Sequence, residues 1–133
     1  MAEFSVESRE RTKSLAAEIR TCMMTNHTPE GEMLSRPMTV LDVDGDGSLW
    51  FLADSKSERT VAFDMDESVN LAFSDPDRSR FLSVSGSAAV LRDREKLDSL
   101  WRPEASEWFP EGKEDPSLRL IKVVPHSAEF WED

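Results

Sequence analysis

Residues 69–91 read VNLAFSDPDRSRFLSVSGSAAVL and carry the clearest structural pattern in the chain. From Phe81 to Leu91 apolar and small residues alternate: Leu82, Val84, Ala88 and Val90 share one face, and Ser83, Ser85 and Ser87 share the other. This period of two predicts a strand with one buried face. Val69 to Ser74 predicts a second strand, and the Asp-Pro-Asp-Arg segment that closes it is typical of a turn. We therefore expect paired strands here.

The segments on both sides of this stretch extend the same pattern. Helices are expected at 6–20, 57–66 and 93–102, with Ser57 and Asp93 as N-caps. Further strands are expected at 21–26, 33–43, 48–53 and 118–124, which leaves 104–116 irregular and 127–133 as a tail. Six strands joined by hairpin turns or one short helix favour an antiparallel sheet that closes into a small barrel, because closure removes exposed edges. The predicted class is mainly β with helices (α+β).

Composition narrows the class of protein further. The 133 residues include 27 acidic and 16 basic side chains, and a net charge of −11 argues against general nucleic-acid binding and against anionic membranes. No apolar run approaches the roughly 20 residues of a membrane span. The first residues, MAEFSVESRERTKS, lack the apolar core of a signal peptide. We expect a single domain over residues 1–133, located in the cytoplasm.

The segment Asp42-Val-Asp-Gly-Asp-Gly47 matches the first half of a calcium-binding EF-hand loop. The twelfth position of such a loop supplies a bidentate Glu, and here it is Ala53. The flanking residues resemble strands rather than helices. We therefore predict an acidic hairpin turn and no metal site, an expectation that fits a chain with one cysteine and two histidines.

Arg36 is the most informative charged residue. In the strand Leu34-Ser-Arg-Pro-Met-Thr-Val40 it shares a face with apolar neighbours. A guanidinium in that position needs an anion, because an unpaired buried charge is costly. The anion is either an internal carboxylate or a ligand phosphate, which a guanidinium binds through two parallel hydrogen bonds. Pro37 cannot donate to a sheet, which places this strand at an edge or makes it irregular.

Two further segments point to a ligand or an interface. Residues 54–59, DSKSER, place hydroxyls and cations where a short helix begins, which is typical of either an anion site or a polar cap. Trp108-Phe109 and Phe130-Trp131 follow no helix or strand period, so we expect them at an interface or against a flat ligand. No recognised catalytic motif is found: Cys22 is expected to be buried, and His27 and His126 have no triad partner nearby in the sequence.

Taken in order, several of these segments resemble a known family. The segments are SRPM at 35–38, VNL at 69–71 with SVSG at 83–86, and WFPEG at 108–112. They are similar to the pyridoxamine 5′-phosphate oxidase-like split-barrel flavoproteins, in particular the small general stress proteins, over residues 20–131. The resemblance implies a six-stranded split β-barrel and a homodimer, with FMN bound between the subunits.

The resemblance also implies which residues bind FMN: Arg36, Pro37, Met38, Thr39, Leu52, Ala53, Ser57, Arg59 and Trp108. Arg36 would hold the phosphate, and Ser57 and Arg59 would complete the phosphate site. The backbone at 37–39 would follow the isoalloxazine, and residues 52–53 would line the ribityl and phosphate end. Trp108 would lean over the cofactor from the partner subunit.

The implied function is that of an FMN-dependent oxidoreductase of unknown substrate. The chain lacks the further basic residues that bind the substrate phosphate in true pyridoxamine phosphate oxidases, which argues against vitamin B6 oxidation. It also carries Ala53 where relatives usually have Thr or Ser, and acidic Asp54 and Glu58 nearby. Two alternatives stay open: a non-enzymatic protein that carries or senses flavin, and a degenerate barrel that binds none.

Overall fold

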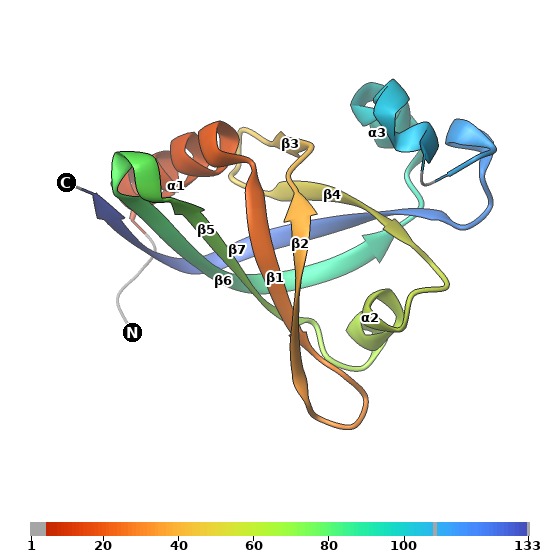
Figure 1. Cartoon of the computed structure of the whole chain (residues 1–133), viewed down its shortest axis with the longest axis horizontal. Helices are drawn as coiled ribbons and strands as arrows, with labels where there is room; N and C mark the ends of the chain where they lie inside the picture. The colour runs from red at the N-terminus through yellow and green to blue at the C-terminus, as the bar shows by residue number, and fades with distance from the viewer. Residues whose placement is uncertain (1–4, 108, 133) are drawn as a thin grey trace.

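The computed structural model describes residues 5–107 and 109–132, and within them one curled antiparallel sheet dominates (Figure 1). The strands run in the spatial order β2-β1-β5-β6-β7-β4-β3. Their bounds are Thr21–His27 (β1), Met33–Thr39 (β2), Asp42–Val43 (β3), Leu49–Asp54 (β4), Ser68–Asp75 (β5), Arg80–Leu91 (β6) and Leu118–Glu132 (β7). The mainly β, antiparallel split-barrel class expected from the sequence is confirmed.

Helices and short 3-10 turns connect or flank the strands. The α-helices are Val6–Ile19 (α1), Glu58–Val61 (α2) and Arg94–Leu100 (α3). The 3-10 turns are Ala62–Asp64 (η1), Pro76–Arg78 (η2), Pro103–Glu107 (η3) and Gly112–Glu114 (η4). Helices α1 and α3 lie toward opposite ends of the sheet (Figure 1). Among the described residues, no helix combines the length and the apolar character needed to cross a membrane.

The expected strand 33–43 is divided in two, so the described chain has seven strands rather than six. At the break, the Val40 N–H donates to the Arg20 carbonyl at 2.7 Å and the Leu41 N–H donates to the Trp50 carbonyl at 2.8 Å. The first bond reaches the residue before β1, and the second reaches β4. Strands β1 and β4 lie beside the two edge strands, at opposite ends of the strand order. The sheet therefore curls, and its two edge strands, β2 and β3, follow each other directly in the chain.

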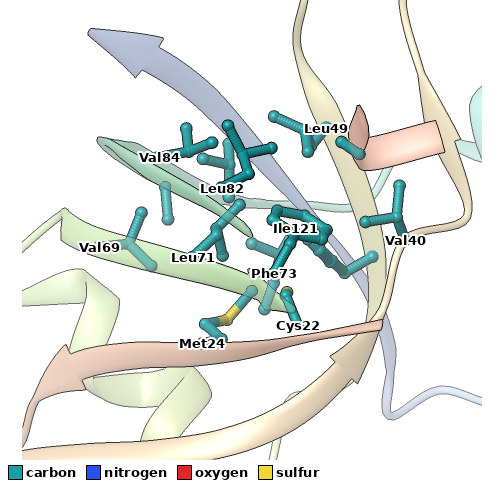
Figure 2. Packing of buried hydrophobic residues seen from close by; sticks show 14 of the residues in the cluster. Cys22, Met24, Val40, Leu49, Val69, Leu71, Phe73, Leu82, Val84 and Ile121 are labelled. Carbon is teal, nitrogen blue, oxygen red and sulfur yellow. The ribbon is translucent and has the colours of Figure 1, made fainter. Parts of the chain in front are cut away.

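The pair β5–β6 forms as the alternation predicts. Its register runs from Ser68 opposite Ser87 to Asp75 opposite Arg80. The connecting turn contains η2 and Ser79, which has a left-handed φ of 53°. The buried faces of these strands supply much of the main core, whose members include Val69, Leu71, Phe73, Leu82 and Val84 (Figure 2).

Strand β7 is the largest departure from the sequence-based expectation. It continues to Glu132, so the tail expected at 127–133 is wrong over the described residues. Its pairing with β6 shifts register between Ser85 and Gly86, opposite Pro125. This bulge interrupts the alternation, which hides the second half of the strand in the sequence. Phe130 and Trp131 lie on that half, and Trp131 pairs with Phe81.

A second apolar cluster lies on the other side of the sheet from the main core. It joins β4 and β7 to α3 and to the loop after η3 through Trp50, Leu97, Leu100, Phe109, Leu118 and Leu120. Phe109 is 6% exposed, so it is a core residue and not an interface or ligand-facing aromatic side chain. Asp93 caps α3 as expected, because its carboxylate accepts from the Lys96 N–H.

The acidic segment 42–47 forms the predicted hairpin turn between β3 and β4. The Asp44 N–H donates to the Ser48 carbonyl, and Gly47 adopts a φ of 92°. The Asp44 carboxylate accepts from Trp50 Nε1 and from Lys96 Nζ, each at 2.8 Å. Burial alone would raise the pKa of Asp44, but these hydrogen bonds outweigh it and lower the pKa below its ordinary value. Asp44 thus anchors the hairpin to α3.

Gly86→Ala should destabilise the protein by about 2 kcal/mol or more. A Cβ at this position would lie 2.2 Å from the Val124 carbonyl oxygen and 3.0 Å from the Pro125 Cα, so the backbone of β7 would have to move. Gly45→Ala is the matched control, because nothing lies within 4 Å of its added Cβ. Urea unfolding of both variants would measure the effect. Equal stability of the two would contradict the close approach.

Asp44→Asn should lower the free energy of unfolding at pH 7 by about 1 kcal/mol, because the charged partner of Lys96 is lost. The folded-state pKa of Asp44 is depressed, so its contribution is present above the unfolded value near 3.9 and is lost as the pH falls through the folded value. The difference from wild type should therefore shrink below about pH 4. Urea unfolding between pH 3 and 7 would show this, with exposed Asp77→Asn as the control. A difference independent of pH would argue against the anchor.

Candidate functional site

Arg36 is half-buried on the face of β2 that packs toward the main core, which we call the inner face of the sheet. It lies opposite Met24 of β1 in the sheet register. Its Nη1 donates to the Asn26 Oδ1 at 3.2 Å, and its Nη2 lies 3.7 Å from the Met24 Sδ. Asn26 is 4% exposed, so its amide is a fixed partner inside the sheet. Strand β1 therefore orients the guanidinium that the sequence marks as an anion ligand.

The residues after Arg36 alternate between the two faces of β2. Pro37 is exposed and lies opposite Met23, on the outer face. Met38 is half-buried and packs against the main core, and Thr39 ends the strand in an exposed position. Strand β2 is an edge of the sheet, as the proline predicts. A ligand can thus approach its backbone without displacing another strand.

The end of β4 and the start of α2 carry the next group of predicted ligands. Ala53 is 8% exposed and belongs to the main core, whereas Leu52 packs against the second cluster on the other side. Only Ala53 thus shares a face with the Arg36 side chain. Ser57 occupies the N-cap position of α2, but it caps through its carbonyl, which accepts from Thr60 and Val61. Arg59 belongs to α2; its side chain and all of Trp108 lie outside the described part of the structure.

A contact between His27 and Asp66 joins the loop after η1 to the end of β1. His27 Nδ1 lies 3.3 Å from Asp66 Oδ2, a neighbour that the sequence did not reveal. The Ser68 N–H, and secondarily His27, lower the pKa of Asp66. A pocket of about 300 Å³ at this junction is lined by residues that include His27, Pro29 and Met65. The elements that carry Arg36 and Ser57 are therefore tied together at one end of the sheet.

Two buried polar residues near the predicted ligands escaped the sequence analysis. Asn26 accepts from Arg36, and Thr60 of α2 is 3% exposed. Strand alternation places Asn26 on the same face as Cys22 and Met24. A polar side chain on that apolar face indicates that Asn26 has a specific hydrogen-bond partner, and this could have been inferred from the sequence. Thr60 had no comparable signal, because α2 is too short to show a period.

The outer face of β1, β5 and β6 is uncharged. Its side chains are Met23, Thr25, Asn70, Ala72, Ser74, Phe81, Ser83 and Ser85. Thr25 Oγ1 and Ser35 Oγ lie 2.6 Å apart, and Asn70 Nδ2 donates to Ser83 and Ser85. Met23 is 43% exposed and Phe81 38%, beside Trp131 at 53%. In a chain with net charge −11, this face is suited to contact with another protein surface.

The expectation for Cys22 is confirmed. It is 2% exposed, and burial raises the pKa of its thiol to about 12. A thiol in that state is not a nucleophile near neutral pH. His126 is exposed, as expected, and its Nε2 lies 3.2 Å from Ser87 Oγ. Neither residue forms a catalytic pair with its described neighbours.

Comparison with known proteins identifies the family. The family model described as pyridoxamine 5′-phosphate oxidase like matches residues 7–133. Protein bli-3 of Neurospora crassa is 28% identical over 117 residues, which cover 81% of this chain and 56% of that protein. The chain thus spans little more than half the length of this relative.

Solved structures agree with this result. A general stress FMN/FAD binding protein of Xanthomonas citri is 30% identical, with a TM-score of 0.77 over 93% of this chain and 87% of that one. A protein of Clostridium acetobutylicum related to general stress protein 26 shares the fold, with a TM-score of 0.80 at 17% identity over 97% of this chain and 91% of that one. Because the family model spans nearly the whole chain and supports the resemblance of its motifs, this protein belongs to the pyridoxamine 5′-phosphate oxidase-like family.

Proposed function

We propose that this chain binds FMN along the free edge of β2, beside Arg36, and works as a flavin-dependent oxidoreductase of unknown substrate, in the manner of a general stress protein. Membership of the family supports flavin binding, as does the similar protein of Xanthomonas citri, which is described as binding FMN or FAD. The observation that carries the proposal is Arg36, a half-buried guanidinium oriented by the buried Asn26.

The phosphate end of FMN is assigned to Arg36, Ser57 and Arg59. Arg36 donates to an amide oxygen and approaches a thioether, and both are neutral acceptors that a phosphate can replace as the stronger partner. Ser57 begins α2, and the loop after its η1 extension is joined to β1 by the contact between His27 and Asp66. Residues 37–39 and 52–53 would line the rest of the cofactor, and Leu52 would do so through its backbone.

Bound flavin supplies the redox chemistry, so the chain needs no nucleophile of its own. The residues of β2 and β4 bind and orient the cofactor, and their apolar neighbours Met38 and Ala53 exclude water from one side of it. Arg36, Met38 and Ala53 line neither the pocket at 91–120 nor the pocket beside His27, and we propose that a second subunit encloses the cofactor and that its Trp108 covers the ring.

The homodimer that we propose uses the uncharged outer face of β1, β5 and β6. Two copies of a chain with net charge −11 repel each other, and contact through the outer faces of these three strands, which carry no carboxylate, reduces that repulsion. Glu129 of β7, opposite Ser83, lies at the border of this face. Met23, Phe81 and Trp131 supply exposed apolar area, and the hydroxyl and amide groups of Thr25 and Asn70 supply adaptable hydrogen bonds.

One observation favours the alternative of a degenerate barrel that binds no flavin. Ala53 offers no hydroxyl to the phosphate, and Asp54 and Glu58 place exposed carboxylates near its expected position. The visible spectrum of the purified protein distinguishes a flavin-binding protein from an empty barrel. Oxidation of NAD(P)H with an added electron acceptor then separates an oxidoreductase from a carrier; bound flavin without turnover would support the carrier.

Arg36→Ala should weaken FMN binding roughly 10- to 150-fold, which corresponds to about 1.5–3 kcal/mol for a charge-assisted hydrogen bond. The empty protein should lose at most about 1 kcal/mol, because the bond to Asn26 that is removed has a neutral acceptor. Thermal melts with and without FMN measure both effects, with exposed Arg78→Ala as the control. An equal loss of stability with and without FMN would show that Arg36 is structural.

FMN should bind more tightly than riboflavin by at least about tenfold, because only FMN carries the phosphate that Arg36 and Arg59 address. Quenching of flavin fluorescence on titration with the protein gives both dissociation constants. The preference should decrease as the salt concentration rises. Equal affinities at low salt would remove these arginines from the site.

A further inference from the structure

A second pocket, away from Arg36, lies where β6 ends and β7 begins. Its volume is about 250 Å³. Its apolar part is built from Leu91, Leu97, Leu118 and Leu120, which come from β6, α3 and β7. Segments 91–97 and 113–120 thus meet at a concave site, where Leu91 is half-buried and the other three leucines are buried. We call it the Arg92–Arg119 pocket, after two of the cations that line it.

The carboxylates of this pocket are already engaged by the protein. Asp93 accepts from the Lys96 N–H at 3.0 Å, and Asp115 accepts from the Ser117 N–H and hydroxyl at 3.0 and 2.7 Å. Glu114 pairs with Arg94, which holds the pKa of that carboxyl below its ordinary value. These acidic groups therefore have donors of their own and do not need the remaining cations of the pocket.

Two guanidinium groups in the pocket have no carboxylate partner within the described residues. Arg119 Nη1 donates to the carbonyls of Pro116 and Leu118, both at 2.8 Å, and these acceptors are neutral. Arg92 is exposed, and it forms no ion pair or hydrogen bond with any side chain that the structure describes. The two side chains lie far apart in the sequence and line one pocket. The pocket carries four cations against three carboxylates, and its two guanidinium groups without an ion pair among the described residues, Arg92 and Arg119, form a site for an anion.

We propose that the Arg92–Arg119 pocket binds a small amphipathic anion, whose apolar or aromatic body lies against Leu91 and whose phosphate or carboxylate group pairs with Arg92 and Arg119. Guanidinium groups recognise both kinds of anion through paired hydrogen bonds. Leu91 gives the body of the ligand an apolar contact that an inorganic ion cannot use. Arg36 lies on β2 and does not line the pocket, whereas Arg119 pairs in register with Ala53, so the pocket adjoins the β4 end of the proposed flavin site.

Phenyl phosphate is a suitable probe, with benzoate as the carboxylate form. Amide chemical shifts from ¹⁵N-labelled protein should move saturably within residues 91–97 and 113–120. Phenol and inorganic phosphate should each bind at least about tenfold more weakly than phenyl phosphate, since each supplies half of the contacts. Benzoate distinguishes a general anion site from one selective for phosphate, and binding of either anion supports the proposal.

Charge reversal tests the role of Arg92. Arg92→Glu should weaken phenyl phosphate binding by at least about threefold, in the range expected for an exposed charge. Arg78→Glu changes the net charge of the protein equally but lies in the β5–β6 turn, so it should leave the affinity almost unchanged. Arg36→Ala should also have no effect. Equal binding of phenol, shifts centred on β2, or equal effects of the two charge reversals would each overturn the proposal.

Discussion

The close contact between Gly86 and the Val124 carbonyl is the constraint on which the sheet depends. Strand β6 pairs with β7 over its whole length, and the register shift at Gly86 lets both strands continue past Pro125. Without it, β7 would end near Val124, and residues 127–132 would have no partner. The continued strand brings Glu132 to Arg11, an ion pair that adds to the packing of Leu15 and Ala16 of α1 in the main core. The bulge at Gly86 thus contributes to the docking of the N-terminal helix.

The charges of this acidic chain are arranged in a consistent way. Several cations hold elements together: Lys96 joins α3 to the β3–β4 hairpin, and Arg80 joins β6 to α1 and to the end of β5. Arg36 and Arg119 also donate to neutral acceptors, the Asn26 side-chain oxygen and two backbone carbonyls. Guanidinium groups placed in this way are the natural candidates for ligand anions.

The parts of the fold that follow from local pattern could be predicted from the sequence. The β5–β6 pair, the Asp44 hairpin and the Asp93 cap each depend on a few neighbouring residues, and each is confirmed. The length of β7 could not be predicted, because its bulge breaks the alternation. Similarly, the burial of Phe109 depends on α3 and β7, which are distant in the sequence.

The candidate site shows the same division between local and tertiary information. Arg36 stood out because a charge on an apolar strand face needs a partner, and the structure supplies Asn26 as one. The opposite orientations of Leu52 and Ala53 follow from strand geometry, but which of them faces Arg36 depends on how the sheet curls. The Arg92–Arg119 pocket has no sequence signature, because its two cations belong to different elements.

Pro37 has a consequence for how molecules of this protein can associate. The Val40 N–H bonds to the Arg20 carbonyl, so the alternating antiparallel pattern directs the amides of Arg36 and Met38 toward β1. The nitrogen of Pro37 therefore points to the free edge of the sheet, in the middle of β2, and it carries no hydrogen. A strand from another molecule would meet a gap in the row of donors at that place. Continuation of the sheet from one molecule into the next, the first step toward fibrous aggregates, is thus blocked at this edge by the same residue that leaves its backbone open to a ligand.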